Sequence, residues 1–121
     1  AFSEASATQL PFPDRSFDVV ITWTVLQHLP NSLVGKALSE IKRVANPKSL
    51  LILCESTLHA GKPETRGQHT HDRFPEFYAE EFSPRSLIVS EFITELDRIP
   101  SMGSPGRLMV FGPVEQASAD S

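Results

Sequence analysis

The sequence predicts an α/β fold in three layers, a sheet of four strands with helices packed against it. Two short runs rich in branched aliphatic residues, 17–22 and 49–56, are typical of strands buried on both faces, as in a parallel sheet. The segment between them, 31–46, has apolar residues at helical spacing. A strand, a helix and a second strand in this order favour parallel pairing through a right-handed crossover.

Composition places the chain among ordinary folded domains. Its 121 residues suffice for one domain, predicted over 1–114, followed by a small polar tail at 115–121. The net charge is -4 without a basic stripe, which argues against nucleic acid as a partner. The longest apolar runs are too short for a membrane span, and the one cysteine, Cys54, fits a reducing, cytoplasmic compartment.

The predicted helix carries signals at both ends. Asn31 or Ser32 is expected to accept hydrogen bonds from its first N–H groups, and Pro47 is expected to end it. Charged residues at ion-pair spacing are expected on the solvent side: Lys36, Glu40 and Arg43. The predicted buried stripe comprises Val34, Ala37, Leu38, Ile41, Val44 and Ala45.

Beyond Thr57 the pattern changes. The polar segment 58–77, with three histidines, is predicted to be a surface excursion. A helix is expected to start at Ser83, with Pro84 in its first turn. Two further strands, 94–102 and 107–114, are separated by "GSPG", which favours an antiparallel hairpin at the end of the sheet.

Two stretches carry a resemblance to a known family. They are "LPFPDRSFDVVITWTVLQHL", 10–29, and "ALSEIKRVANPKSLLIL", 37–53. Their order and spacing match the pattern LPF-x-D-x-SFDVV, L-x-H-L and E-x-x-RV-x-x-P. The chain thus resembles a class I S-adenosylmethionine-dependent methyltransferase of the small-molecule type, by motif over 5–56 and by element order beyond.

The resemblance implies a Rossmann-like sheet that closes with an antiparallel hairpin, S-adenosylmethionine as cofactor and a small molecule as methyl acceptor. The predicted strands would be the fourth to seventh of the family's sheet, so the chain would be its C-terminal half. A glycine-rich loop and an acid that holds the ribose belong to the other half, and the sequence has no G-x-G-x-x-G motif. The chain is therefore expected to be inactive alone.

Two functions remain open at this point. The chain is either a methyltransferase whose N-terminal half must be supplied, or a non-catalytic binding or assembly module. In both cases the strand 17–22 would be an unpaired apolar edge. Such an edge predicts a homodimer or pairing with a separate N-terminal half.

The resemblance also suggests site residues. Ser6 and Ala7 would border the adenine, and three residues after the buried strand would flank the methionine part of the cofactor: Thr22, Trp23 and Thr24. Trp23 could instead cap the core. His28 could be a base that faces the acceptor, or it could hold the turn into the next helix.

Other polar residues have simpler interpretations. Glu55 ends the second strand, where it could touch substrate, although a solvated carboxylate is favoured. Asp14 and Asp18 are interpreted as turn and strand-edge residues, and Arg73 with Tyr78 resembles a lid element of relatives. No metal site is predicted, because the spacing of the candidate ligands does not match a zinc motif: His59, His69, His71 and Asp72.

Overall fold

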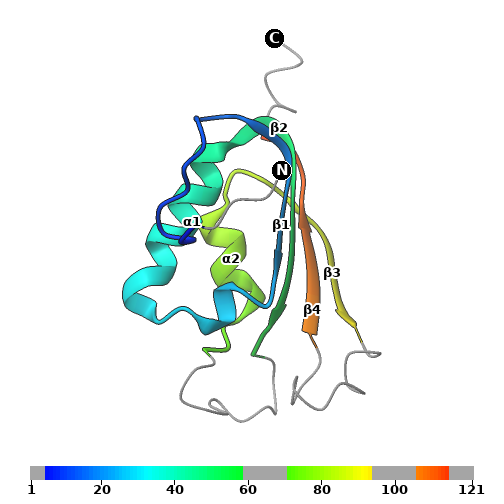
Figure 1. The fold of residues 1–121 in the computed structure, drawn as a ribbon. Helices are drawn as coiled ribbons and strands as arrows, with labels where there is room; N and C mark the ends of the chain where they lie inside the picture. The colour runs from blue at the N-terminus through cyan, green and yellow to red at the C-terminus, as the bar shows by residue number, and fades with distance from the viewer. Residues whose placement is uncertain (1–4, 59–70, 94–105, 115–121) are drawn as a thin grey trace.

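The computed structural model describes residues 5–58, 71–93 and 106–114. Its four strands lie in one sheet in the order β1-β2-β4-β3. Both helices lie on the same face of this sheet (Figure 1). The elements are β1 Phe17–Trp23, the 3-10 helix η1 Leu26–His28, α1 Asn31–Val44, β2 Ala45–Ser56, α2 Pro75–Glu81, β3 Leu87–Ile93 and β4 Gly106–Phe111.

The α/β fold class is confirmed. β1 pairs with β2 in parallel, as the strand–helix–strand order predicted, and β1 forms one edge of the sheet. Of the three expected layers, the described residues form two: the sheet and one layer of helices.

The antiparallel pairing at the end of the sheet is also confirmed, but the partner of β4 there is β3 and not the predicted strand 94–102. β4 pairs antiparallel with both β2 and β3. The helix predicted from Ser83 is wrong, since Leu87–Ile93 is strand β3. This run contains two consecutive β-branched residues, Ile88 and Val89, followed by Phe92 and Ile93, which favour a strand. The strand predicted over 94–102 lies outside the described residues.

Helix α1 begins and ends differently from the prediction. Its N-cap is Pro30, and no side chain caps the helix, so neither Asn31 nor Ser32 has the expected role. The helix ends at Val44 because Ala45 is already extended and opens β2, in which Pro47 lies. The predicted stripe is confirmed: Val34, Ala37, Leu38, Ile41, Val44 and Ala45 are all buried.

Strand β1 was expected to be buried on both faces, and this is wrong for one face. Val19, Ile21 and Trp23 are 47%, 62% and 55% exposed, because no described helix covers their side of the sheet. Val20 and Thr22 alternate with them and turn toward the helices, as a strand's period of two requires.

The end of the segment 58–77, predicted to be a surface excursion, packs against the rest of the protein. Residues 59–70 lie outside the described part, but Arg73 is buried and precedes α2 directly. Tyr78 of α2 and the neighbouring Phe82 are fully buried against the sheet, where the ring of Phe82 lies 5.1 Å from that of Phe111. This short helix therefore completes the core under β2 and β4.

Candidate functional site

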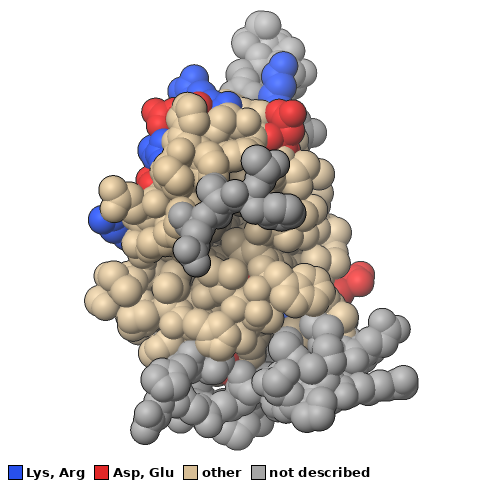
Figure 2. Space-filling view, viewed as in Figure 1, with Lys and Arg blue, Asp and Glu red and all other residues tan. Residues whose placement is uncertain are grey.

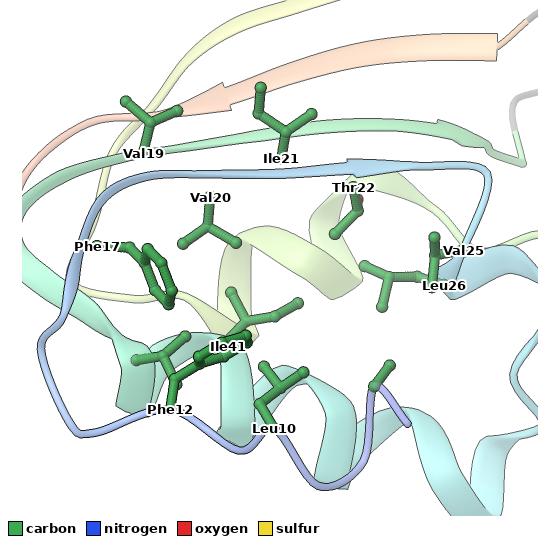
Figure 3. A pocket seen from close by; sticks show the side chains of 12 residues that line it. Leu10, Phe12, Phe17, Val19, Val20, Ile21, Thr22, Val25, Leu26 and Ile41 are labelled. Atoms are coloured by element: carbon green, nitrogen blue, oxygen red, sulfur yellow. The ribbon is translucent and has the colours of Figure 1, made fainter. Parts of the chain in front are cut away.

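A pocket of about 320 Å³ opens between the edge strand β1, helix α1 and the segment that precedes β1. In Figure 3, Leu10, Phe12, Val20 and Thr22 approach one another from these elements, while Val19 and Ile21 point to the opposite side of the strand. The lining is apolar except for one side chain: it comprises Ala7, Leu10, Phe12, Phe17, Val19, Val20, Ile21, Thr22, Val25, Leu26, Ile41 and Val44.

The segment that borders this pocket is held by helix α1. The backbone N–H of Leu10 donates to Glu40 Oε1 at 2.8 Å, and the carbonyls of Leu10 and Phe12 each accept from the Arg43 guanidinium at 2.8 Å. Arg43 also donates to Asp14 Oδ1 at 2.8 Å and to Glu40 Oε2 at 2.8 Å. Glu40 and Arg43 are thus not a free solvent-side pair, since they fix the backbone of the "LPFPD" loop.

These contacts leave an electrostatic signature. The hydrogen bond from Arg43, followed by that from the Leu10 amide, lowers the pKa of Glu40 to about 2. The same pairing raises the pKa of Arg43 above its ordinary range. Both groups are therefore charged at neutral pH and hold the loop as an ion pair.

The turn that follows β1 is organised around Glu55. This carboxylate, near the end of β2, is fully buried, so its interpretation as a solvated group is wrong. It accepts hydrogen bonds from Thr22 Oγ1 at 2.7 Å, from the Gln27 amide at 3.0 Å and from the Val25 amide at 3.2 Å. Burial raises the pKa of Glu55, and the hydrogen bonds from Thr22 and from the turn's amides oppose this shift.

Arg73 holds the other end of the same turn. Its guanidinium donates to the carbonyls of Leu26 at 3.0 Å and Leu29 at 2.6 Å, and to Asn31 Oδ1 at 3.0 Å. The carboxylate thus meets amides at the start of η1, and the cation meets carbonyls at its end. Because a helical turn has its positive pole at the start and its negative pole at the end, both charges complement it.

The residues expected at the cofactor site do not all meet. Ala7 and Thr22 line the pocket, whereas Ser6 is exposed and exchanges a 2.8 Å hydrogen bond with Thr8 of its own loop. Trp23 points to the uncovered face of the sheet, so it neither caps the core nor lines the pocket. Thr24 lies in the turn, with φ of 52° and its amide donating to the Cys54 carbonyl at 2.8 Å.

His28 lies at the end of η1 with an exposed side chain, outside the pocket lining. Its amide donates to the Val25 carbonyl at 3.2 Å, which is a turn contact. Of the four metal candidates, His59 and His69 lie outside the described residues. Within the described part, no three His, Cys, Asp or Glu side chains gather as metal ligands would.

Arg73 and Tyr78, which resembled a lid, are instead buried in the protein. Burial raises the pKa of Tyr78 to about 12, with Arg73 opposing the shift. Sequence reasoning missed the roles of Glu55, Arg73 and the Glu40–Arg43 pair. The available signal was a lone glutamate within an otherwise uncharged run, "SLLILCES", because a charge in such a run must find donors nearby.

Comparison with known proteins agrees with this geometry. Residues 1–53 match the model of the methyltransferase domain family. This part of the chain, somewhat less than half of it, is therefore similar to a methyltransferase domain. The matched part contains β1, α1 and most of β2. These elements carry the pocket, the Glu40–Arg43 pair that holds the loop, and the turn after β1.

Two curated proteins each match less than half of the chain. An uncharacterized protein of Haemophilus influenzae is 46% identical over 48 residues, which cover 40% of this chain and 19% of that protein. An uncharacterized methyltransferase of Schizosaccharomyces pombe is 41% identical over 58 residues, covering 48% of this chain and 20% of that protein. The aligned part is therefore about a fifth of each relative's length.

Solved structures match over nearly the whole chain and share its fold. The cyclase SpnF superposes with a TM-score of 0.68 at 18% identity, over 93% of this chain and 56% of that one. A Burkholderia thailandensis 1,6-didemethyltoxoflavin-N1-methyltransferase with bound S-adenosylhomocysteine also has a TM-score of 0.68, at 13% identity, over 90% of this chain and 48% of that one. A putative methyltransferase in complex with the Haloferax volcanii activator Trm112 matches with a TM-score of 0.63 at 17% identity, over 90% of this chain and 59% of that one. The chain spans about half the length of these structures.

The described residues fit S-adenosylmethionine only in part. The pocket offers an apolar wall of the kind that an adenine ring contacts. Its one polar side chain, Thr22, already donates its hydroxyl proton to Glu55. No carboxylate lines the pocket among the described residues, so the ribose hydroxyls and the charged methionine end would need groups from elsewhere.

Proposed function

We propose that this chain is the C-terminal part of an S-adenosylmethionine-dependent methyltransferase domain that acts on a small molecule. In this proposal Ala7, Thr22 and the turn to Thr24 form one wall of the cofactor site. An N-terminal half-domain, in the same polypeptide or in a separate one, supplies the glycine-rich loop and the acid for the ribose. The chain without that half does not transfer methyl groups.

The observation that carries the proposal is the pocket at the open edge of β1. It combines the loop held by Glu40 and Arg43 with the carboxyl end of a parallel strand, where open α/β sheets bind their ligands. Its wall is preformed, because both the loop and the turn are fixed by hydrogen bonds within this chain. The methyltransferase with bound S-adenosylhomocysteine shares this fold, which supports the choice of cofactor.

Surface chemistry supports a missing counterpart. β1 ends the sheet, and Val19, Ile21 and Trp23 expose apolar area on the face that no described helix covers. Figure 2 shows few charged side chains over the middle of the molecule, with charges gathered toward the end where β2 begins. The one charged residue of β1, Asp18, lies near its start, so the rest of this edge strand is open to pairing with another strand.

The alternative is a non-catalytic module that forms a homodimer or docks on a partner through β1. One comparison favours keeping it, because the putative methyltransferase with this fold was solved in complex with the activator protein Trm112. SpnF, which is a cyclase, has the same fold. The fold alone therefore does not set the reaction.

Neither helix among the described residues is long and apolar enough to cross a membrane.

The test is to titrate S-adenosylhomocysteine into the chain by calorimetry, with and without an N-terminal half-domain of the same family. We expect affinity weaker than about millimolar for the chain alone and at least about 100-fold tighter binding for the complemented protein. Ile21→Lys should abolish complementation, because it places a charge on the uncovered face beside the open edge. Ile88→Lys is the matched control, since Ile88 is 58% exposed against 62% for Ile21 and lies on the opposite edge strand.

A complemented protein that does not bind S-adenosylhomocysteine would refute the enzyme proposal. Light scattering of the chain alone then tests the alternative. A dimer that Ile21→Lys dissociates and Ile88→Lys preserves supports the assembly module, and a folded monomer contradicts it.

A further inference from the structure

We infer that Glu55 is a positioning residue for the cofactor site: its buried carboxylate holds the turn after β1 in the conformation that forms the site's wall. This inference rests on the proposed function. Glu55 is not among the described residues that line the pocket, but it accepts hydrogen bonds from three that are: Thr22, Val25 and Leu26. It therefore acts through the turn.

The turn needs such support because it contains an unfavourable backbone conformation. Thr24 has φ of 52°, in the left-handed region, where a β-branched side chain crowds the backbone. Such residues persist only when surrounding contacts over-determine them, and they cluster at ligand sites. Thr24 lies between Thr22 and Val25, which both donate to Glu55 Oε2.

The connection between the turn and β2 runs in both directions. Glu55 Oε1 accepts from the Gln27 amide at 3.0 Å, and Gln27 Oε1 in turn accepts from the Ser56 amide at 2.6 Å. The Thr24 amide adds a third tie to the Cys54 carbonyl. The residues 54–56 of β2 therefore hold Thr24, Val25 and Gln27 of the turn. Of these three strand residues, only Glu55 does so with its side chain.

The carboxylate matters because its two oxygens accept from several donors at once. A carboxylate can accept from the Thr22 hydroxyl and from two amides together, whereas an alanine leaves all three donors unpaired in a buried place. Glutamine keeps one acceptor oxygen for the Gln27 amide, and its own NH2 group can donate to the Thr22 hydroxyl oxygen, so that of these three donors only the Val25 amide loses its acceptor. Glu55→Gln should therefore preserve the turn in large part.

The experiment compares Glu55→Ala, Glu55→Gln and a matched control, Leu53→Ala. Leu53 lies on the same strand and face and is 1% exposed, and its aliphatic side chain cannot form hydrogen bonds with the turn. Amide hydrogen exchange of each chain is measured at Val25 and Gln27 and compared with core amides of β2. We expect Glu55→Ala to speed exchange at Val25 and Gln27 at least about tenfold beyond the change in the core, and Leu53→Ala to change turn and core alike.

The functional measurement uses S-adenosylhomocysteine and the complemented protein at a temperature where every variant is folded. Glu55→Ala should weaken binding at least about tenfold, whereas Glu55→Gln and Leu53→Ala should stay within about threefold of the unsubstituted protein. Equal loss in Glu55→Ala and Leu53→Ala, or unchanged turn exchange in Glu55→Ala, overturns the role of Glu55. Failure of the proposed function is a different result from failure of the Glu55 role, because in that case even the unsubstituted complemented protein binds no S-adenosylhomocysteine. The inference about Glu55 would then fall with the proposed function.

Discussion

Replacing Arg73 by methionine tests whether the end of the turn depends on the buried guanidinium. Methionine keeps much of the side-chain length but has no N–H groups. The change removes the donors of the Leu26 and Leu29 carbonyls, at 3.0 and 2.6 Å, and of Asn31 Oδ1. Arg73 is 7% exposed, so water cannot readily replace these bonds.

The expected loss follows from the number of bonds and their burial. Hydrogen bonds from a charged donor contribute about 1.5–3 kcal/mol each, and orphaned buried acceptors add to the cost. The Leu29 carbonyl and Asn31 Oδ1 lose the Arg73 donor, and the Leu26 carbonyl keeps only the Leu29 amide at 3.1 Å. We therefore expect the free energy of unfolding to fall by about 3 kcal/mol, measured by urea denaturation. Arg73→Lys should recover only part of this, because an ammonium cannot reproduce the planar fork of a guanidinium.

Arg107→Met is the matched control. Arg107 also donates to two oxygens, Thr57 Oγ1 at 3.1 Å and Ser90 Oγ at 2.9 Å, and its guanidinium lies 4.1 Å from the ring centre of Phe92. These contacts are more exposed, so the loss should be about 1 kcal/mol. Losses for the two variants that agree within about 0.5 kcal/mol would refute the reasoning, because they would show that burial of the Arg73 network adds nothing.

Three further outcomes follow from burial and charge. Tyr78 is the one tyrosine in the sequence, and its pKa of about 12 against 10.0 means that the folded state binds the phenol proton more tightly than the unfolded state. The free energy of unfolding should therefore keep its full value below pH 10 and fall as the pH rises toward 12. An absorbance titration that shows ionisation near pH 10 in the folded protein would contradict this. Glu40, with its pKa lowered from 4.5 to about 2, should stabilise the folded state above pH 4.5, and this stabilisation should be lost as the pH falls toward 2. Glu40→Gln should flatten this part of the plot of unfolding free energy against pH. A plot identical to that of the unsubstituted chain would count against the role of Glu40 in holding the loop. Phe111→Ala should lower the free energy of unfolding by about 3–5 kcal/mol because Phe111 is fully buried beside Phe82, whereas Phe74→Ala, at a site 51% exposed, should cost less than about 1 kcal/mol by the same assay.

The first half of the fold was predictable because its signals agree with one another. The apolar stripe of α1 and the largely apolar runs on either side fix a helix between two strands, and their short connections leave parallel pairing as the outcome. The second half was harder, since "LIVSEFI" contains residues compatible with either a helix or a strand. Pairing with β4 decides for the strand, and this contact is not visible in the local sequence.

The site was predictable in place but not in detail. The carboxyl edge of β1 directs attention to Thr22, Trp23 and Thr24 through the general geometry of α/β sheets. Which of them faces the pocket depends on the pleat and on which sheet face the helices cover, and Trp23 consequently lies outside the pocket lining. The partner of Thr22 lies 33 positions further along the chain, so no local pattern could identify it.

The two stretches that carry the family resemblance contact each other in the fold. Glu40 and Arg43 of the second stretch bind Leu10, Phe12 and Asp14 of the first. The resemblance is therefore a pattern of contacts as well as of order and spacing. Because these contacts lie within one chain, they fix this wall of the pocket without any contact from another chain. The half-domain that we propose would therefore meet a preorganised surface, and its affinity would depend on the shape of the β1 edge more than on any ordering of the loop.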